Sequence, residues 1–223
     1  MNRGAIMKHI VNMNIHYGKD LSHKLYDFCW NHCEHIVLSK RANQVEDVEA
    51  LRMAVMEKSN EISLRGEKQL KQAETLSLKA IKREGFKNKA ELEKLIVKTT
   101  KEDLAVVNSY LHNYKEGSGA FKKDLISYGL DSSIISIGSY VTFPGIWDIC
   151  FFNKHMLELE TVRDNIFSTP ILVGEYEFED IAFADENKIV WMKVCAHEGF
   201  FQMELDEQAY REFLLYNIPH SVR

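Results

Sequence analysis

Proline and glycine, the residues that most often interrupt regular structure, are scarce over the first part of this chain. The 223 residues contain three prolines, Pro144, Pro170 and Pro219, so none occurs in the first 143 residues. Glycine is absent between Lys19 and Arg65. A stretch that lacks these breakers and is rich in Leu, Lys, Glu and Ala is typical of helix.

Several sequence signals of location and chemistry are also missing. No apolar run approaches the roughly 18 residues that predict a membrane span, and His and Asn interrupt the N-terminal segment too often for a signal peptide. Four cysteines in a chain of this length predict reduced thiols in a cytoplasm. Nucleotide-binding, zinc-protease and EF-hand motifs are absent. We therefore predict no membrane association, catalytic residues, cofactor or metal, and favour a function other than catalysis.

The pattern of apolar residues in residues 1–116 predicts one strand followed by helices. Val11, Met13 and Ile15 alternate with polar residues, so we expect a strand over 8–17. From Leu21 onward, apolar residues recur with the period of a helix. The expected helices cover residues 21–36, 45–83, 89–98 and 100–114.

Residues 120–223 have a different pattern, which begins after the linker candidate at 116–119. A short helix over 121–128 that ends at Gly129 and a final helix over 206–216 that starts at Asp206 are expected to enclose a group of strands. The expected strands lie near 133–143, 146–152, 170–183, 188–196 and 200–205. We predict an α+β protein: a helix-rich region over 1–116 and an antiparallel sheet with a terminal helix over 120–223. The strand at 8–17 is expected to join that sheet.

Charge is divided unevenly along the chain. Residues 1–115 contain 20 Lys and Arg against 15 Asp and Glu, whereas residues 116–223 contain 8 against 18. Such asymmetry points to electrostatic partners. The two halves could also face each other.

The basic surplus is concentrated between residues 65 and 101. On a helix, six cations of this segment would form a stripe opposite an apolar seam. These residues are Arg65, Lys68, Lys71, Lys79, Lys82 and Arg83. The stripe could simply solvate a helical bundle, contact an acidic protein surface, or neutralise the phosphates of a nucleic acid.

The acidic surplus has its sharpest pattern between residues 174 and 180. Alternation along a strand would place Glu175, Glu177 and Glu179 on one face and aromatic residues on the other. Asp180, Asp185 and Glu186 extend the negative charge, so six residues form a candidate partner-binding face. Such a row can protect a strand edge from aggregation, or it can attract a basic protein.

Two groups of cysteine and histidine deserve comparison with reactive or metal sites. Cys29, His32 and Cys33 would share one helical face, but that face is apolar, so we interpret them as core residues rather than metal ligands. In a strand, Cys195 would share a face with Lys193 and His197, which could activate a thiol. A thiol or metal enzyme is therefore a third class of function.

We predict a cytoplasmic protein-binding module of the inhibitor or immunity type, which neutralises a basic protein through an acidic sheet face. The alternative is a nucleic-acid-associated protein that uses the helix at 65–101.

Overall fold

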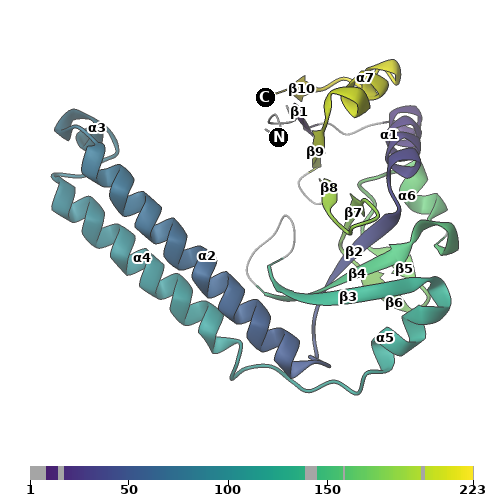
Figure 1. Ribbon diagram of the computed structural model, residues 1–223, viewed down its shortest axis with the longest axis horizontal. Coiled ribbons are helices and arrows are strands. Elements are labelled where there is room, and N and C mark those ends of the chain that lie inside the picture. The colour runs from purple at the N-terminus through teal and green to yellow at the C-terminus, as the bar shows by residue number, and fades with distance from the viewer. Residues whose placement is uncertain (1–8, 15–17, 139–144, 158, 197–198, 223) are drawn as a thin grey trace, which may run out of the picture. The chain divides into compact units, whose positions relative to one another are not determined.

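The computed structural model describes residues 9–14, 18–138, 145–157, 159–196 and 199–222 (Figure 1). The fold class is α+β, as predicted. The chain forms two compact units. The sheet unit combines residues 1–42 with residues 118–223, and the hairpin unit consists of residues 43–117.

An eight-stranded sheet forms the centre of the sheet unit, and every pair of neighbouring strands is antiparallel. Its order is β10-β1-β9-β8-β7-β2-β4-β3. The strands are β1 (His9–Asn14), β2 (His35–Arg41), β3 (Leu130–Ile137), β4 (Ile146–Asn153), β7 (Asp180–Ala184), β8 (Val190–Cys195), β9 (Phe200–Leu205) and β10 (Ser221–Val222). The N-terminal strand does join the sheet, because β1 pairs with β9. The end of the strand expected at 133–143 lies outside the described residues.

β2 corrects the sequence prediction, which extended the first helix to Ile36. Helix α1 (Lys19–His32) ends four residues earlier, and the chain enters β2 at His35. β2 is a central strand between β4 and β7. Its residues from Ile36 to Ser39 are all buried, as expected for a strand covered on both faces. The β-branched pair Ile36-Val37 also favours strand over helix.

Four helices cover one face of the sheet. They are α1, α5 (Ala120–Leu125), α6 (Glu160–Asp164) and α7 (Glu207–Leu215), and each contributes buried side chains to the main apolar core. α5 continues into the 3₁₀ turn η1 (Ile126–Tyr128), which ends at Gly129 with a φ of +86°. The short helix expected at 121–128 and its glycine end are therefore confirmed. A smaller cluster around Val37 and Trp147 lies on the opposite face.

The hairpin unit consists of α2 (Val48–Thr75), α3 (Leu78–Arg83) and α4 (Lys89–Ser109). α2 and α4 run antiparallel and side by side (Figure 1). At their base, Val45 pairs with Glu116 in an isolated parallel bridge. The prediction of a helix break near Thr100 is wrong. Thr100 lies inside α4, where its hydroxyl donates a 2.8 Å hydrogen bond to the carbonyl of Ile96.

Gly66 of α2 lies very close to Thr100 of α4. A Cβ atom at this position would lie 2.6 Å from Thr100 Oγ1 and 3.0 Å from Thr100 Cγ2. The absence of a side chain at Gly66 therefore allows the two helices to pack at this distance.

The units divide the charge differently from the predicted regions 1–116 and 120–223. Residues 1–42 belong with the sheet, and they carry part of the basic surplus of the N-terminal half. The sheet unit has 14 Lys and Arg against 20 Asp and Glu, whereas the hairpin unit has 14 against 13. The negative charge thus belongs to the sheet unit, and the hairpin unit is close to neutral. None of the helices among the described residues is long and apolar enough to cross a membrane.

Candidate protein-binding surface

The predicted row of glutamates lies on a small hairpin rather than on one long strand. β5 (Ile171–Val173) and β6 (Tyr176–Phe178) form a separate two-stranded sheet, and β7 begins two residues later. Val173 pairs with Tyr176, so Gly174 and Glu175 form a two-residue turn. Gly174 has a φ of +60°, the sign required of the first central residue in a type II′ turn. The single strand expected at 170–183 is therefore wrong, and Gly174 is the signal that marks the turn.

Glu175, Glu177 and Glu179 are all exposed, whereas Phe178 is fully buried in the core. Within the part of the chain that the structure describes, no ion pair engages any of the three carboxylates. Asp180 differs from them, since it is 3% exposed and its Oδ1 accepts a hydrogen bond from the amide of Ala196. Asp180 therefore does not belong to an exposed binding face.

Asp185 shapes the turn after β7. Its Oδ1 accepts 2.9 Å hydrogen bonds from the amides of Asn187 and Ile189. Its carboxylate is thus occupied by the backbone, which leaves Glu186 as the exposed acidic residue of this turn. Of the six predicted residues, Glu175 and Glu177 lie on the β5–β6 hairpin and Glu179 directly follows it.

Apolar side chains that sequence reasoning missed lie beside these glutamates. Leu172 is 60% exposed and is the cross-strand partner of Glu177. Tyr128 of η1 is 40% exposed and lies against Gly174, because a Cβ atom there would be 2.8 Å from its hydroxyl oxygen. A pocket of about 600 Å³ opens between η1 and the turn, with Lys123, Asp124, Tyr128 and Glu175 in its wall. No local pattern could reveal this contact, which joins segments more than 40 residues apart.

The hairpin is held firmly to the rest of the sheet unit. The hydroxyl of Tyr176 donates a 2.6 Å hydrogen bond to Asp124 on α5. The ammonium of Lys40 lies 4.6 Å from the ring centre of Phe121 and 5.4 Å from that of Tyr176, within the range of cation–π attraction. We define the β5–β6 surface as Leu172, Glu175, Glu177, Glu179 and Tyr128.

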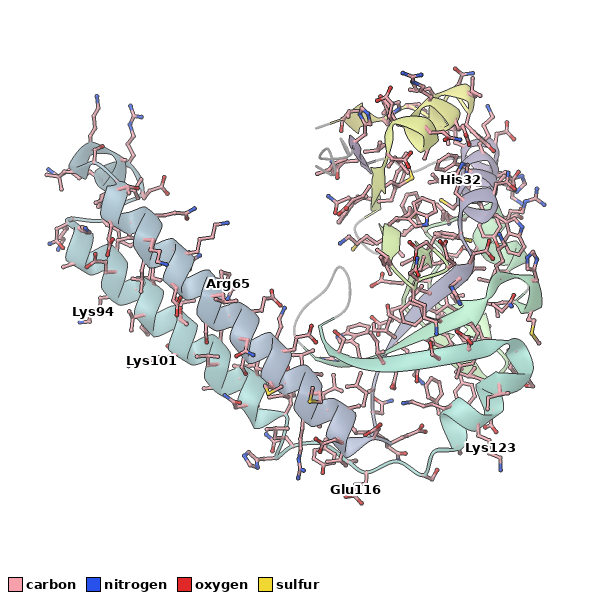
Figure 2. The ribbon with its side chains drawn as sticks, in the orientation of Figure 1. His32, Arg65, Lys94, Lys101, Glu116 and Lys123 are labelled. Atoms are coloured by element: carbon pink, nitrogen blue, oxygen red, sulfur yellow. The ribbon has the colours of Figure 1, made fainter. Side chains whose placement is uncertain are left out.

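The basic stripe is interrupted. α2 ends at Thr75, and Leu76 and Ser77 separate it from α3, so the single helix expected over 45–83 is wrong. Figure 2 labels Arg65 on α2 and Lys94 and Lys101 on α4. Arg65 pairs with Asp103 of α4 and thus serves the packing of the hairpin.

The other cations of the stripe form two exposed groups. Lys68 and Lys71 lie on α2. Lys79, Lys82 and Arg83 lie on α3 and, together with Leu78, line a pocket of about 520 Å³.

The cysteines are buried thiols. Burial raises the pKa of Cys29 and raises that of Cys33 to about 12, so both thiols stay protonated. His32 faces away from them, with Nδ1 2.8 Å from the carbonyl of Phe28 and Nε2 2.8 Å from Glu212. Cys195 is also fully buried, and its proposed partner His197 lies outside the described residues.

Comparisons with known proteins add no further constraint, because no protein-family model, curated protein or solved structure matches this chain.

Proposed function

We propose that this protein is a cytoplasmic binding module that neutralises a basic protein partner, in the manner of an inhibitor or immunity protein. The observation that carries the proposal is the β5–β6 surface, where three exposed carboxylates without ion pairs among the described residues flank exposed Leu172 and Tyr128.

The spacing of the carboxylates favours a cationic partner. Glu177 of β6 and Glu179 are alternate residues, which lie about 7 Å apart along an extended chain, within the Debye length of about 8 Å at physiological salt. Glu175 lies in the adjacent turn, two residues before Glu177. Their fields therefore add, and each carboxylate raises the free energy of its neighbours. Lysine or arginine side chains of a partner would relieve this repulsion and would accelerate association.

The apolar residues give such a partner something to bury. Protein interfaces combine an apolar centre with a polar rim. Here Leu172 and Tyr128 would form the apolar centre, and the glutamates would form the polar rim. Most of the binding free energy is expected from the centre, and the orientation and salt dependence from the rim.

A charge-reversal variant tests the proposal. We would replace Glu175, Glu177 and Glu179 by lysine and compare this variant with the native chain in pull-downs from native lysate, followed by mass spectrometry. The native chain is expected to recover a cationic protein, and the variant to lose it. Binding should also weaken when salt is raised to about 0.5 M, because screening shortens the Debye length.

The control is a second triple variant with the same change in net charge. Glu57, Glu67 and Glu74 are exposed on α2, and no ion pair involves them within the described ranges. Their replacement by lysine should leave recovery of the partner unchanged. Equal loss with both variants, or binding indifferent to salt, would contradict the proposal.

The second candidate function is association with nucleic acid through the hairpin unit. It is favoured by the exposed cations that α3 presents around one pocket. Phosphate binding would give affinity that falls steeply with salt. In a gel shift, the native chain should retard RNA or DNA, and charge reversal of Lys68, Lys71, Lys79 and Lys82 should abolish this retardation. If the variant and the native chain retard the nucleic acid equally, this function is excluded.

A further inference from the structure

A second pocket of the sheet unit lies between α1 and the segment from η2 (Lys154–Met156) to α6. Its volume is about 550 Å³. One wall comes from Tyr26, Asp27 and Trp30 of α1, and the other includes His155 and Arg163. Lys154, Leu157 and Leu159 complete the lining, and all three are buried. The pocket is thus lined by two buried leucines together with aromatic and charged side chains.

Three of the polar groups that line this pocket make no hydrogen bond with the described part of the chain. The hydroxyl of Tyr26, the indole N–H of Trp30 and the ring of His155 have no hydrogen-bond partner among the described residues. Burial raises the pKa of Tyr26, so its hydroxyl keeps its proton and remains a donor. Donors that are left without acceptors at a pocket favour a ligand that supplies acceptors.

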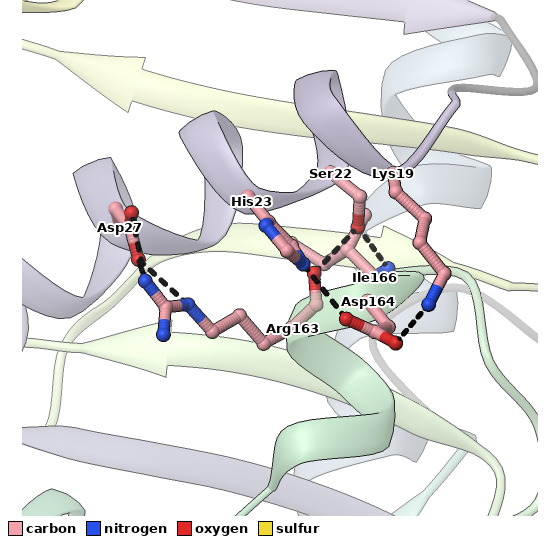
Figure 3. A network of polar contacts seen from close by, with 7 residues as sticks. All are labelled: Lys19, Ser22, His23, Asp27, Arg163, Asp164 and Ile166. Atoms are coloured by element: carbon pink, nitrogen blue, oxygen red, sulfur yellow. Dashed lines mark hydrogen bonds and ion pairs between the residues drawn. The ribbon is translucent and has the colours of Figure 1, made fainter.

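Arg163 brings a guanidinium to this pocket, where it is paired with the carboxylate of Asp27. Its Nε and one terminal nitrogen donate to the two carboxylate oxygens of Asp27, at 3.1 and 3.2 Å. Figure 3 shows the remaining terminal nitrogen turned away from Asp27. This arrangement holds the guanidinium in place and keeps one edge available for a second anion.

The walls of the pocket are joined by further polar contacts (Figure 3). The hydroxyl of Ser22 donates to the carbonyl of Arg163 and accepts from the amide of Ile166, at 3.1 and 2.7 Å. Asp164 contacts both Lys19 and His23. These contacts fix α6 against α1, so the pocket exists before a ligand arrives and binding requires little reorganisation.

Lys154 plays a structural part here. Its ammonium donates to the carbonyls of Trp30 and Cys33, at the end of α1, and lies 3.6 Å from Glu34. The donors left for a ligand are therefore those of Tyr26, Trp30, His155 and Arg163.

We infer that this pocket binds a small aromatic anion, with its carboxylate or phosphate at the donors and its ring against Trp30. The ring of Trp30 stacks on Tyr26 and meets His155 edge-on, and it offers a face of the kind that planar ligands contact. This inference is independent of the β5–β6 surface.

Ligand-observed NMR with three probes of similar size tests the inference. Phenylacetate and phenyl phosphate each carry an anion on an aromatic ring, and benzyl alcohol lacks the charge. We expect the native chain to bind at least one anion and to bind benzyl alcohol at least about tenfold more weakly, the effect of one hydrogen bond to a charged group. A preference between the two anions identifies the ligand as a carboxylate or a phosphate.

Two variants locate the binding. Tyr26→Phe removes only the hydroxyl, and His155→Ala removes an exposed ring that makes no hydrogen bond within the described structure. Each substitution should weaken binding of the anion by about tenfold. The matched controls, Tyr114→Phe and His112→Ala in the hairpin unit, should bind as the native chain does. Equal binding of benzyl alcohol and the anions, or unchanged binding by both pocket variants, would overturn the inference.

Discussion

Replacement of Gly66 by alanine should destabilise the helical hairpin, although alanine is the better helix former. The gain in helix propensity is about 1 kcal/mol. Against it, the new Cβ atom would lie 2.6 Å from Oγ1 and 3.0 Å from Cγ2 of Thr100. Because both γ atoms are too close, rotation of the Thr100 side chain exchanges one clash for another. The helices must then separate, at a cost of about 1–3 kcal/mol for an overpacked contact. The net effect ranges from neutrality to a loss of about 2 kcal/mol.

The same substitution should become stabilising when Thr100 is alanine. That residue lacks both γ atoms, and its Cβ would lie 3.4 Å from the new methyl group, an ordinary contact. A double-mutant cycle of Gly66→Ala and Thr100→Ala should therefore show a favourable coupling energy of about 1–3 kcal/mol. Because the chain has two units, global unfolding curves can mix two transitions. Hydrogen exchange of peptides from α2 and α4 measures the hairpin alone. If Gly66→Ala slows exchange equally in the native chain and in the Thr100→Ala variant, the close approach of Gly66 to Thr100 does not limit the packing of the two helices.

Three further predictions concern the sheet unit. Ser22→Ala should cost about 1–3 kcal/mol, since it leaves the buried amide of Ile166 without an acceptor; a urea midpoint equal to that of the native chain would contradict this. Lys154→Met should cost a similar amount, about 1–3 kcal/mol, because two carbonyls at the end of α1 lose their donor; thermal melting measures the loss, and an unchanged Tm would show that water replaces the ammonium. The pKa values of Glu207 and Glu212 are lowered, in each case chiefly by a hydrogen bond from a histidine. Folding therefore gains stability from both groups above their ordinary pKa of 4.5, and this gain is lost as the pH falls below it. The variant with glutamine at both positions should lose less stability than the native chain between about pH 5 and pH 3 in urea titrations.

The elements that were predicted correctly are those with local signals. Gly129 ends the turn after α5 in the left-handed conformation that glycine favours. Asp206 was expected to start the last helix, and its Oδ1 accepts a 2.8 Å hydrogen bond from the amide of Ala209. Both signals act within three residues, so they do not depend on tertiary contacts.

The elements that were missed depend on contacts between distant segments. Ile36 fits the apolar period of α1, and only the neighbouring strands β4 and β7 make it part of a strand. Thr100 begins a sequence typical of a helix start, but α4 packs against the long helix α2 and continues through this position. The pocket between α1 and α6 joins segments more than 120 residues apart, so nothing in either segment predicts it.

The charge split of the linear sequence is a poor guide to partners, because it ignores which carboxylates are already engaged. In the sheet unit, many acidic side chains contact a cation of the same unit. Examples are Asp27, Asp131, Asp164 and Glu207.

The carboxylates of the β5–β6 hairpin differ, since three of them lie within five residues and none is engaged by a cation in the described ranges. Net charge sets the long-range field, but unpaired charge beside exposed apolar surface decides where a partner gains free energy. The charge-reversal pair on Glu175, Glu177 and Glu179 and on α2 separates these two effects, because both variants change the net charge equally and only one changes the surface.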